Sequence, residues 1–273
     1  MISPNPYLPC PAKILEVIDE TPTIKTLVVR PQTPMPFAAG QFVQLTLPGV
    51  GEAPFTPSSS PLEPDRIAIT ILNTGVVTER LHACSEGRLL GLRGPFGKGY
   101  PIDKTRDKEV LVVGGGVGLA PLRALILALL ADLGSVRRLS IKYGARCMEE
   151  LLYRDQHDRW AQNPKVDFTC TIDRPQEGWT GRTGVVTVLL KGADVDRSNT
   201  LVFVCGPTVM LKFTTLTLIE EGFKPDQIYL SMNRRMSCGM GLCGRCNIGP
   251  YYLCKDGPDI CYAKIKDYPN VFP

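Results

Sequence analysis

Short apolar runs recur along roughly the first third of the chain. They cover residues 13–20, 24–30, 41–47, 66–72 and 88–94, and clusters of Pro and Gly separate them. Spacing of this kind is typical of the short strands of a small antiparallel barrel. No helical pattern longer than two turns interrupts the runs, except around residues 78–85. The pattern therefore predicts an antiparallel β-barrel as the first domain, over residues 1–105.

The rhythm of the chain changes after Asp107. An apolar strand over 109–113 runs into a glycine-rich turn and an apolar helix, and further continuous apolar strands follow at 138–146, 165–173 and 200–207. Strands that alternate with a helix in this way indicate a parallel α/β sheet. We expect a parallel α/β domain over residues 106–230 and a small C-terminal lobe over residues 231–273.

Length and charge limit the classes of function. A chain of 273 residues can hold two domains and a short third module. Its net charge is +4 and its Lys and Arg residues do not cluster, which argues against a nucleic-acid partner. The longest apolar run, after Arg123, is too short to cross a bilayer. Without a secretory signal at its start, the chain is expected in the cytoplasm, with His82 and His157 in surface or cap roles.

Two turns are candidates for binding a dinucleotide. The segment VVGGGVGLAP, residues 112–121, ends a strand in glycines and opens a helix. Such a turn directs backbone N–H groups and the positive end of a helix toward a pyrophosphate. A second turn, Cys205–Pro207, ends another predicted parallel strand, and ligands of open α/β sheets bind at such carboxyl ends. A tight turn without a ligand remains the alternative for the first turn, and a core thiol remains the alternative for Cys205.

Four cysteines with the spacing C-x4-C-x2-C-x7-C lie in the C-terminal lobe. Three explanations compete: disulfides, a zinc site or an iron–sulfur cluster. Disulfides fit a reducing compartment poorly, and structural zinc is usually held by two separate knuckles. The order C-x4-C-x2-C followed by a later Cys is that of plant-type [2Fe–2S] loops, which favours the cluster. The predicted ligands are Cys238, Cys243, Cys246 and Cys254, with Cys261 as the competing fourth ligand.

The other cysteines are scattered along the chain, and in a reducing compartment we expect them to be small buried side chains. These are Cys10, Cys84, Cys147, Cys170, Cys205 and Cys261.

Several motifs together resemble a known family. They are GGGVGLAP, YGAR at 143–146, CGP at 205–207, RGPFGKGYPI from residue 93, GQFVQLTLPGVGEAPFTPSSSP from residue 40, and the cysteine loop with its CKDGP tail. Taken in their order along the chain, they resemble the ferredoxin–NADP reductase superfamily, and within it the iron–sulfur flavoprotein subunits. The resemblance implies an FAD-binding barrel, a domain that binds NAD or NADP, and a [2Fe–2S] lobe.

The resemblance also implies roles for individual residues. The family's R-x-Y-[ST] flavin strand corresponds to residues 53–56, where Ala53 replaces the arginine, and its G-x-x-[ST] pyrophosphate turn corresponds to residues 75–78. An ordinary Pro-rich edge and an empty helix cap are the alternatives. Thr56 would reach the flavin N5 region, and Cys205 would lie near the nicotinamide C4. The implied cofactor contacts are Pro54, Phe55, Thr56, Ile71, Asn73, Gly75, Val77, Thr78, Gly115, Gly116, Gly118, Leu119, Ala120, Pro121, Arg146, Cys205, Gly206 and Pro207.

Two arginines bear on the choice between NAD and NADP. Arg146 and Arg174 could pair with a 2′-phosphate, which would favour NADP. Each could equally be a solvated loop arginine or a contact to the pyrophosphate. The choice of dinucleotide therefore stays open.

The function implied is that of an electron-transfer, or diaphorase, subunit. It would work with a cluster-bearing subunit and a catalytic subunit, those of a cytoplasmic nickel–iron hydrogenase, or alternatively of dihydroorotate dehydrogenase or anaerobic sulfite reductase. A rival from another class is a non-catalytic, zinc-stabilised assembly subunit that binds a dinucleotide. The cysteine loop also carries a mixture of charged and exposed-type apolar residues suited to docking a partner: Arg234, Arg235, Arg245, Met236, Met240 and Leu242.

Overall fold

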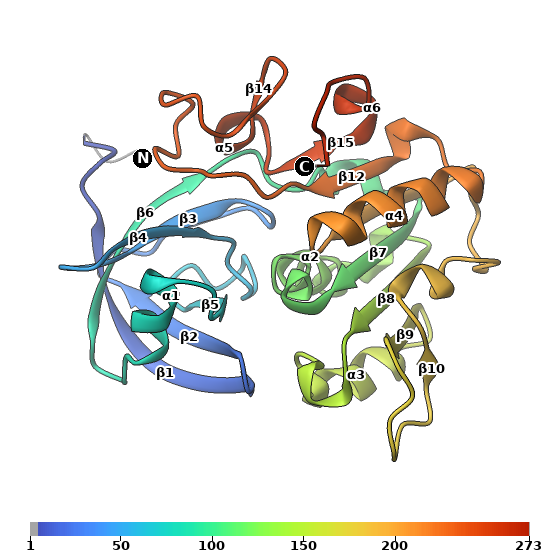
Figure 1. Cartoon of the computed structure of the whole chain (residues 1–273), viewed down its shortest axis with the longest axis horizontal. Helices are drawn as coiled ribbons and strands as arrows, with labels where there is room; N and C mark the ends of the chain where they lie inside the picture. Colours follow the sequence, from blue (N-terminus) through green and yellow to red (C-terminus); the bar gives the residue numbers. More distant parts are fainter. Residues whose placement is uncertain (1–4, 273) are drawn as a thin grey trace.

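A computed structural model describes residues 5–272 and contains two large sheets with a loop-rich lobe above them, which holds a small two-stranded sheet (Figure 1). The first sheet has six strands in the order β4-β3-β6-β1-β2-β5, and every neighbouring pair is antiparallel. Its strands are β1 (Cys10–Thr21), β2 (Ile24–Pro31), β3 (Phe42–Leu47), β4 (Gly51–Phe55), β5 (Ile67–Leu72) and β6 (Leu89–Phe96).

The six-stranded sheet confirms the predicted barrel domain, with one difference. Its edge strands β4 and β5 approach one another without a hydrogen-bonded ladder, so the barrel is not closed. Apolar side chains from one face of the sheet, such as Leu27, Leu45 and Ile69, are fully buried in its core. The helix α1 (Val76–His82) lies where the sequence predicts a short helical stretch.

The second sheet has seven strands and is parallel except at one edge. Its order is β10-β9-β8-β7-β11-β12-β15. The strands are β7 (Glu109–Gly115), β8 (Arg138–Ala145), β9 (Val166–Ile172), β10 (Arg182–Thr183), β11 (Thr200–Cys205), β12 (Ile228–Ser231) and β15 (Asp259–Cys261), and the helices are α2 (Leu119–Ala131), α3 (Arg154–Ala161) and α4 (Thr208–Glu220). Short 3-10 turns lie at Ile102–Thr105, Gly116–Gly118, Leu133–Ser135, Met148–Glu150, Val186–Leu189 and Pro225–Gln227.

The α/β domain is confirmed, and its central strands are buried along their length. In β7 every residue after Glu109 is buried, and so is every residue of β11. Continuous apolar strands of this kind are expected where helices cover both faces of a parallel sheet. The connection from β7 runs outward through β8 and β9 and then returns to β11 on the other side of β7.

The C-terminal lobe packs on both sheets and completes one of them. It contains β13 (Asn247–Ile248), β14 (Tyr251–Tyr252), α5 (Leu253–Asp256) and α6 (Tyr262–Ile265). Its strand β15 pairs antiparallel with β12 and so forms the edge of the seven-stranded sheet. The domain limits at 105/106 and 230/231 stay predictions, and the outermost residues of the first and third domains, 1–4 and 273, lie outside the described residues.

Polar contacts fix the two sheets relative to one another. Tyr153 directly precedes α3, and its hydroxyl lies 2.7 Å from the Thr70 hydroxyl on β5. From α2, Arg123 donates a 2.6 Å hydrogen bond to the carbonyl of Ser58. No helix within residues 5–272 is long and apolar enough to cross a membrane.

Candidate active site

The two glycine-rich turns lie side by side at the carboxyl edge of the seven-stranded sheet. In the register of the parallel strands, Gly114 on β7 is opposite Cys205 on β11. The strand order reverses at this point, because β8 lies on one side of β7 and β11 on the other. In open α/β sheets, ligands bind in the crevice at such a switch point. The structure therefore brings together the two turns that the sequence singles out.

Gly118 permits the close approach of the two turns. A Cβ atom at this position would lie 2.4 Å from the carbonyl oxygen of Cys205, and that obstacle is backbone. Gly116 has a φ of +53°, a conformation that favours glycine. The side chains of Leu119 and Ala120 are buried, so these residues present only their backbone to the crevice. The hydroxyl of Tyr143 lies 3.3 Å from the carbonyl oxygen of Gly116 and supports the turn.

Cys205 is buried at the end of β11 in a polar junction. Burial, and then the charge of Asp259, raise the pKa of its thiol to about 12, so the thiol stays protonated near neutral pH. Ser231 is its register partner on β12, and Asp259 on β15 is the partner of Ser231 in turn. The Ser231 hydroxyl bonds Asp259 and lies 2.8 Å from the Tyr100 hydroxyl. A protonated, tightly held thiol suits positioning rather than nucleophilic attack.

Asp259 is the most unusual ionisable group of this junction. Burial raises the pKa of its carboxyl to about 8. Its Oδ2 atom has no hydrogen-bond partner within residues 5–272, and a Cβ at Gly40 would lie 2.1 Å from that atom. Gly40 is therefore required where the first sheet passes this carboxyl.

The residues implied for the flavin lie where the first sheet meets the glycine turn. Thr56 directly follows β4, and Phe55 packs against the core of the six-stranded sheet. Ile71 is fully buried in β5, and the backbone N–H of Asn73 just beyond donates to the carbonyl of Thr23. Strand β5 contacts both β4 and the Gly116–Gly118 turn. Strand β5 therefore links the predicted flavin strand to the predicted dinucleotide turn.

The turn at residues 75–78 is a regular helix start. The Thr78 hydroxyl accepts hydrogen bonds of 2.9 Å from the backbone N–H groups of Thr74 and Gly75. Val76 is exposed, and Val77 packs against the edge of the first sheet. The structure is compatible with either a bound pyrophosphate or a self-capped helix.

The predicted arginines and histidines fall into two groups. Arg146 and Arg174 are exposed just beyond β8 and β9, at the same edge of the sheet as the glycine turn. His82 and His157 instead bond backbone carbonyls, those of Ile71 and Leu152, at 2.8 Å. The histidines thus have structural positions.

The four predicted cluster ligands gather in the lobe as two pairs. Cys243 lies close enough to the Cys238 sulfur to lower the pKa of that thiol, and the sulfurs of Cys246 and Cys254 lie 3.3 Å apart. No group of three or more His, Cys, Asp or Glu side chains within residues 5–272 is arranged to hold a metal ion. A single zinc would need four ligands around one point, whereas a two-iron cluster needs two cysteines for each iron. The paired arrangement fits the two-iron cluster better.

Backbone N–H groups of the cysteine loop point at the sulfur atoms. Met240 and Leu242 donate to the Cys238 sulfur at 3.4 and 3.3 Å, and Gly241 donates to the Cys254 sulfur at 3.0 Å. Although burial raises the pKa of Cys238, these donors and Cys243 lower it to about 6. Hydrogen bonds to sulfur stabilise thiolates and tune cluster potentials. The loop therefore favours negative charge on Cys238, whereas burial raises the pKa of Cys254 to about 12.

The remaining cysteines lie away from this cluster of thiols. The Cys261 sulfur is 3.7 Å from the carbonyl of Pro225, which lies just before β12. Cys205 is buried as expected, but the other five scattered cysteines are partly exposed, so that prediction is wrong for them. They lie on strand edges and in loops, where spacing along the chain does not reveal exposure.

Sequence comparison connects these features to known proteins. Residues 112–215 match the oxidoreductase NAD-binding domain, and residues 233–266 match the iron–sulfur cluster binding domain of dihydroorotate dehydrogenase B. The chain is 34% identical to sulfhydrogenase 1 subunit gamma of Pyrococcus furiosus, over 99% of this chain and 97% of the relative. The chain therefore belongs to the family of the sulfhydrogenase gamma subunits.

A second relative agrees with this assignment, and solved structures share the fold. The probable dihydroorotate dehydrogenase B (NAD(+)) electron transfer subunit of Methanocaldococcus jannaschii is 35% identical, over 94% of this chain and 91% of the relative. The structure of an NADH-dependent reduced ferredoxin–NADP oxidoreductase has a TM-score of 0.74 at 25% identity and covers 97% of this chain and 93% of its own. A ferredoxin–NADP reductase from Neisseria gonorrhoeae, with bound FAD and NADP, has a TM-score of 0.71 at 21% identity. The match covers 81% of this chain and 96% of the reductase.

Sequence reasoning missed two residues that seat the cluster lobe of this family member on the first sheet. Gln44, at 1% exposure, donates from Nε2 to the carbonyls of Met236 and Ser237. Arg93 bonds Glu52 at 2.5 and 2.8 Å and approaches the carbonyl of Cys238 at 3.5 Å. For Gln44, the available sequence signal was a glutamine among the mostly apolar residues of the strand FVQLTL.

Proposed function

We propose that this chain is a diaphorase subunit that passes electrons between NAD(P)H, FAD and a [2Fe–2S] cluster, to or from a partner catalytic subunit in the cytoplasm. The observation that carries this proposal is the convergence of three candidate sites. The glycine turn lies beside Cys205 and contacts β5, β5 contacts β4, and the segment that leads into the cysteine loop is bonded by Gln44 of β3. A bound flavin would supply the exchange between two-electron and one-electron transfer that such an order of sites requires.

The residues of the chain act in this scheme by binding and positioning. The Gly115–Gly118 backbone and the start of α2 would hold the dinucleotide pyrophosphate, and the rigid Cys205 thiol would place the nicotinamide against the flavin. Phe55 and Thr56 would face the flavin from β4. Correct placement of the two rings accounts for the rate without a general acid or base. Arg146 and Arg174 would meet the ribose end of the dinucleotide.

The composition of the purified protein tests this proposal against the zinc-stabilised rival. Protein purified without oxygen is expected to contain two irons, two acid-labile sulfides and one FAD for each chain, because four cysteines hold one [2Fe–2S] cluster. Iron, sulfide, zinc and flavin assays measure this directly. A colourless protein with one zinc would end the diaphorase proposal.

A partner subunit of hydrogenase type is favoured by the names of the relatives. Two gamma subunits of Pyrococcus furiosus sulfhydrogenases are 34% and 33% identical to this chain. Electron transfer subunits of dihydroorotate dehydrogenase B are similarly distant, at 33–37%, and support dihydroorotate dehydrogenase as the alternative. Anaerobic sulfite reductase is the remaining alternative from the motifs.

The docking face that we propose is the outer side of the cysteine loop. Leu242 is 71% exposed, and Arg245 and Cys243 are exposed beside it. Of the other expected interface residues, Met240 and Arg234 are partly exposed and Arg235 is exposed, but Met236 is buried against the first sheet, so its predicted exposure is wrong. An apolar centre with a charged rim suits an interface that exchanges electrons.

Charge reversal of Arg245 tests this docking face. We expect Arg245→Glu to lower partner-dependent turnover at least tenfold, because the new carboxylate would either repel a negative charge on the partner or stay unpaired in the interface. NAD(P)H-dependent dye reduction should be unchanged. Arg88→Glu is the matched control, since Arg88 is also exposed but lies on the first sheet away from the lobe. Equal loss of both activities in Arg245→Glu would assign the arginine to the fold or the cluster instead.

A further inference from the structure

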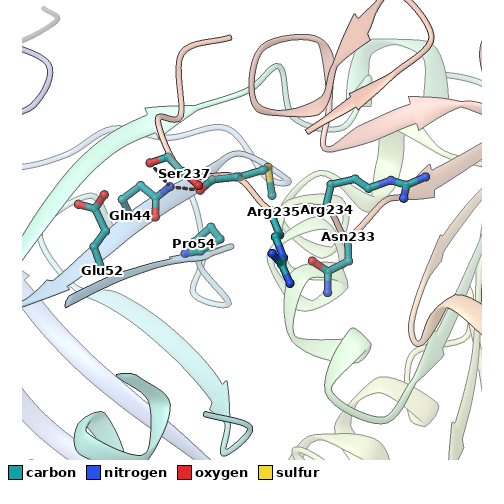
Figure 2. A pocket seen from close by; sticks show the side chains of 8 residues that line it. Gln44, Glu52, Pro54, Asn233, Arg234, Arg235 and Ser237 are labelled. Atoms are coloured by element: carbon teal, nitrogen blue, oxygen red, sulfur yellow. Dashed lines mark hydrogen bonds between the residues drawn. The ribbon is translucent and has the colours of Figure 1, made fainter. Parts of the chain in front are cut away.

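A cavity of about 670 Å³ lies between the first sheet and the segment that leads into the cysteine loop (Figure 2). This volume is in the range of cofactor sites. The described residues that line it come from β3, β4 and residues 233–237, and none comes from the α/β domain. They are Gln44, Glu52, Pro54, Asn233, Arg234, Arg235, Met236 and Ser237.

Gln44 presents an unpartnered oxygen at this cavity. Its Nε2 atom faces two carbonyl oxygens, those of Met236 and Ser237, and a flipped amide would set oxygen against oxygen. Its Oε1 atom is then buried with no hydrogen-bond partner within residues 5–272. A buried acceptor without a partner costs about 1–3 kcal/mol. The cavity therefore calls for a ligand that donates a hydrogen bond, which a phosphate group does not.

The charges that line the cavity are positive on balance. Glu52 is the carboxylate among the lining residues, and Arg93 neutralises it through two hydrogen bonds. Arg235 has no hydrogen bond or ion pair to any residue of 5–272, and Figure 2 shows it extending into the open space beside Pro54, whereas Arg234 points away. A ligand with acceptor atoms or negative charge would match the guanidinium group of Arg235.

We propose that Gln44 and Arg235 complete the flavin site, with Gln44 accepting from a ring N–H or ribityl hydroxyl of FAD and Arg235 placing positive charge beside the ring. This inference rests on the proposed function. The cavity adjoins Pro54 of the flavin strand and lies before the cysteine loop, where electrons cross from flavin to cluster. Strand β4, GEAPF, carries no cation, so Arg235 from the lobe supplies the positive charge at this place.

A cation at this place has a measurable consequence. Reduced flavin carries more negative charge than oxidised flavin, and protein charge near the ring tunes its potential. Arg235 should therefore favour the reduced form over the oxidised form. Gln44, which is neutral, should support both forms to a similar degree.

Potentiometric titration of the purified protein, with FAD fluorescence for affinity, separates these effects. We expect Arg235→Ala to reduce the preference for reduced over oxidised FAD about tenfold, which corresponds to a fall of ~30 mV in the two-electron midpoint potential. Arg235→Lys should retain most of the preference. Gln44→Leu should weaken FAD binding several-fold in both redox states.

Arg245→Ala is the matched control, because Arg245 is an exposed arginine of the same loop that does not line the cavity. The cluster absorbance should persist in every variant and shows that the lobe is folded. If Arg235→Ala shifts the flavin potential no more than Arg245→Ala, the assignment of Arg235 is wrong while the proposed function stands. Unchanged FAD affinity in Gln44→Leu would overturn the assignment of Gln44. A wild-type protein that binds no FAD would overturn both the inference and the proposed function.

Discussion

Cys254→Ser is expected to abolish the [2Fe–2S] signal or change it strongly, while the flavin remains. The sulfur of Cys254 lies 3.3 Å from that of Cys246 and accepts a hydrogen bond from Gly241. Because each iron of a two-iron cluster needs two protein ligands, loss of one thiolate destabilises half of the site. Visible absorbance and electron paramagnetic resonance of the anaerobically reduced protein measure the cluster, and released FAD measures the flavin.

Cys261→Ser is the matched control for this substitution. Cys261 lies on β15 with its sulfur near the carbonyls of Pro225 and Asp226, so its change should leave both cofactors in place. The reverse result, with the cluster lost in Cys261→Ser and kept in Cys254→Ser, would transfer the fourth ligand to Cys261. It would also require β15 to leave its pairing with β12.

Gly118→Ala is expected to impair the dinucleotide site more than any other single methyl addition there. The new Cβ would meet the backbone of Cys205 at 2.4 and 2.6 Å, and neither strand at this junction can move freely, because β7 and β11 are central in the sheet. Overpacking of this kind costs ~1–3 kcal/mol. The KM for NAD(P)H in dye reduction should rise at least tenfold, and thermal unfolding should begin at a lower temperature.

Gly134→Ala provides the comparison for Gly118→Ala. Gly134 follows α2, and a Cβ there would meet no atom within 4 Å. Its KM for NAD(P)H should match that of the wild type. A normal KM in Gly118→Ala would show that the two turns do not need their close approach for dinucleotide binding.

The main strands could be predicted because their apolar patterns are long and uninterrupted. The apolar pattern alone predicts strands β7, β8, β9 and β11 of the second sheet. It also predicts strands β1, β2, β3, β5 and β6 of the first sheet. Strand β4 was implied by the family resemblance but not by the apolar pattern, because GEAPF combines Gly and Pro and has no alternation. Strands β12 and β15 were missed because they are only four and three residues long and pair across the lobe boundary.

Some parts of the candidate site could likewise be predicted from the sequence, and others could not. Local motifs placed the glycine turn, the CGP turn and the cysteine spacing, because each is a short segment with its own backbone requirement. The roles assigned to their residues stay predictions. The partners of Gln44, Arg93 and Asp259 could not be identified in advance, because they lie between 28 and 193 positions away in the chain. No local pattern encodes such contacts.

Anaerobic titration of the isolated subunit with NADH, and separately with NADPH, tests the central claim most directly. Absorbance follows the flavin, and electron paramagnetic resonance follows the cluster. We expect one of the two dinucleotides to reduce both centres at low micromolar to millimolar concentrations, typical of such substrates, with one unpaired spin appearing on the cluster. Reduction of the flavin without the cluster, or of neither centre by either dinucleotide, would contradict the proposal that hydride pairs are converted to single electrons in this chain.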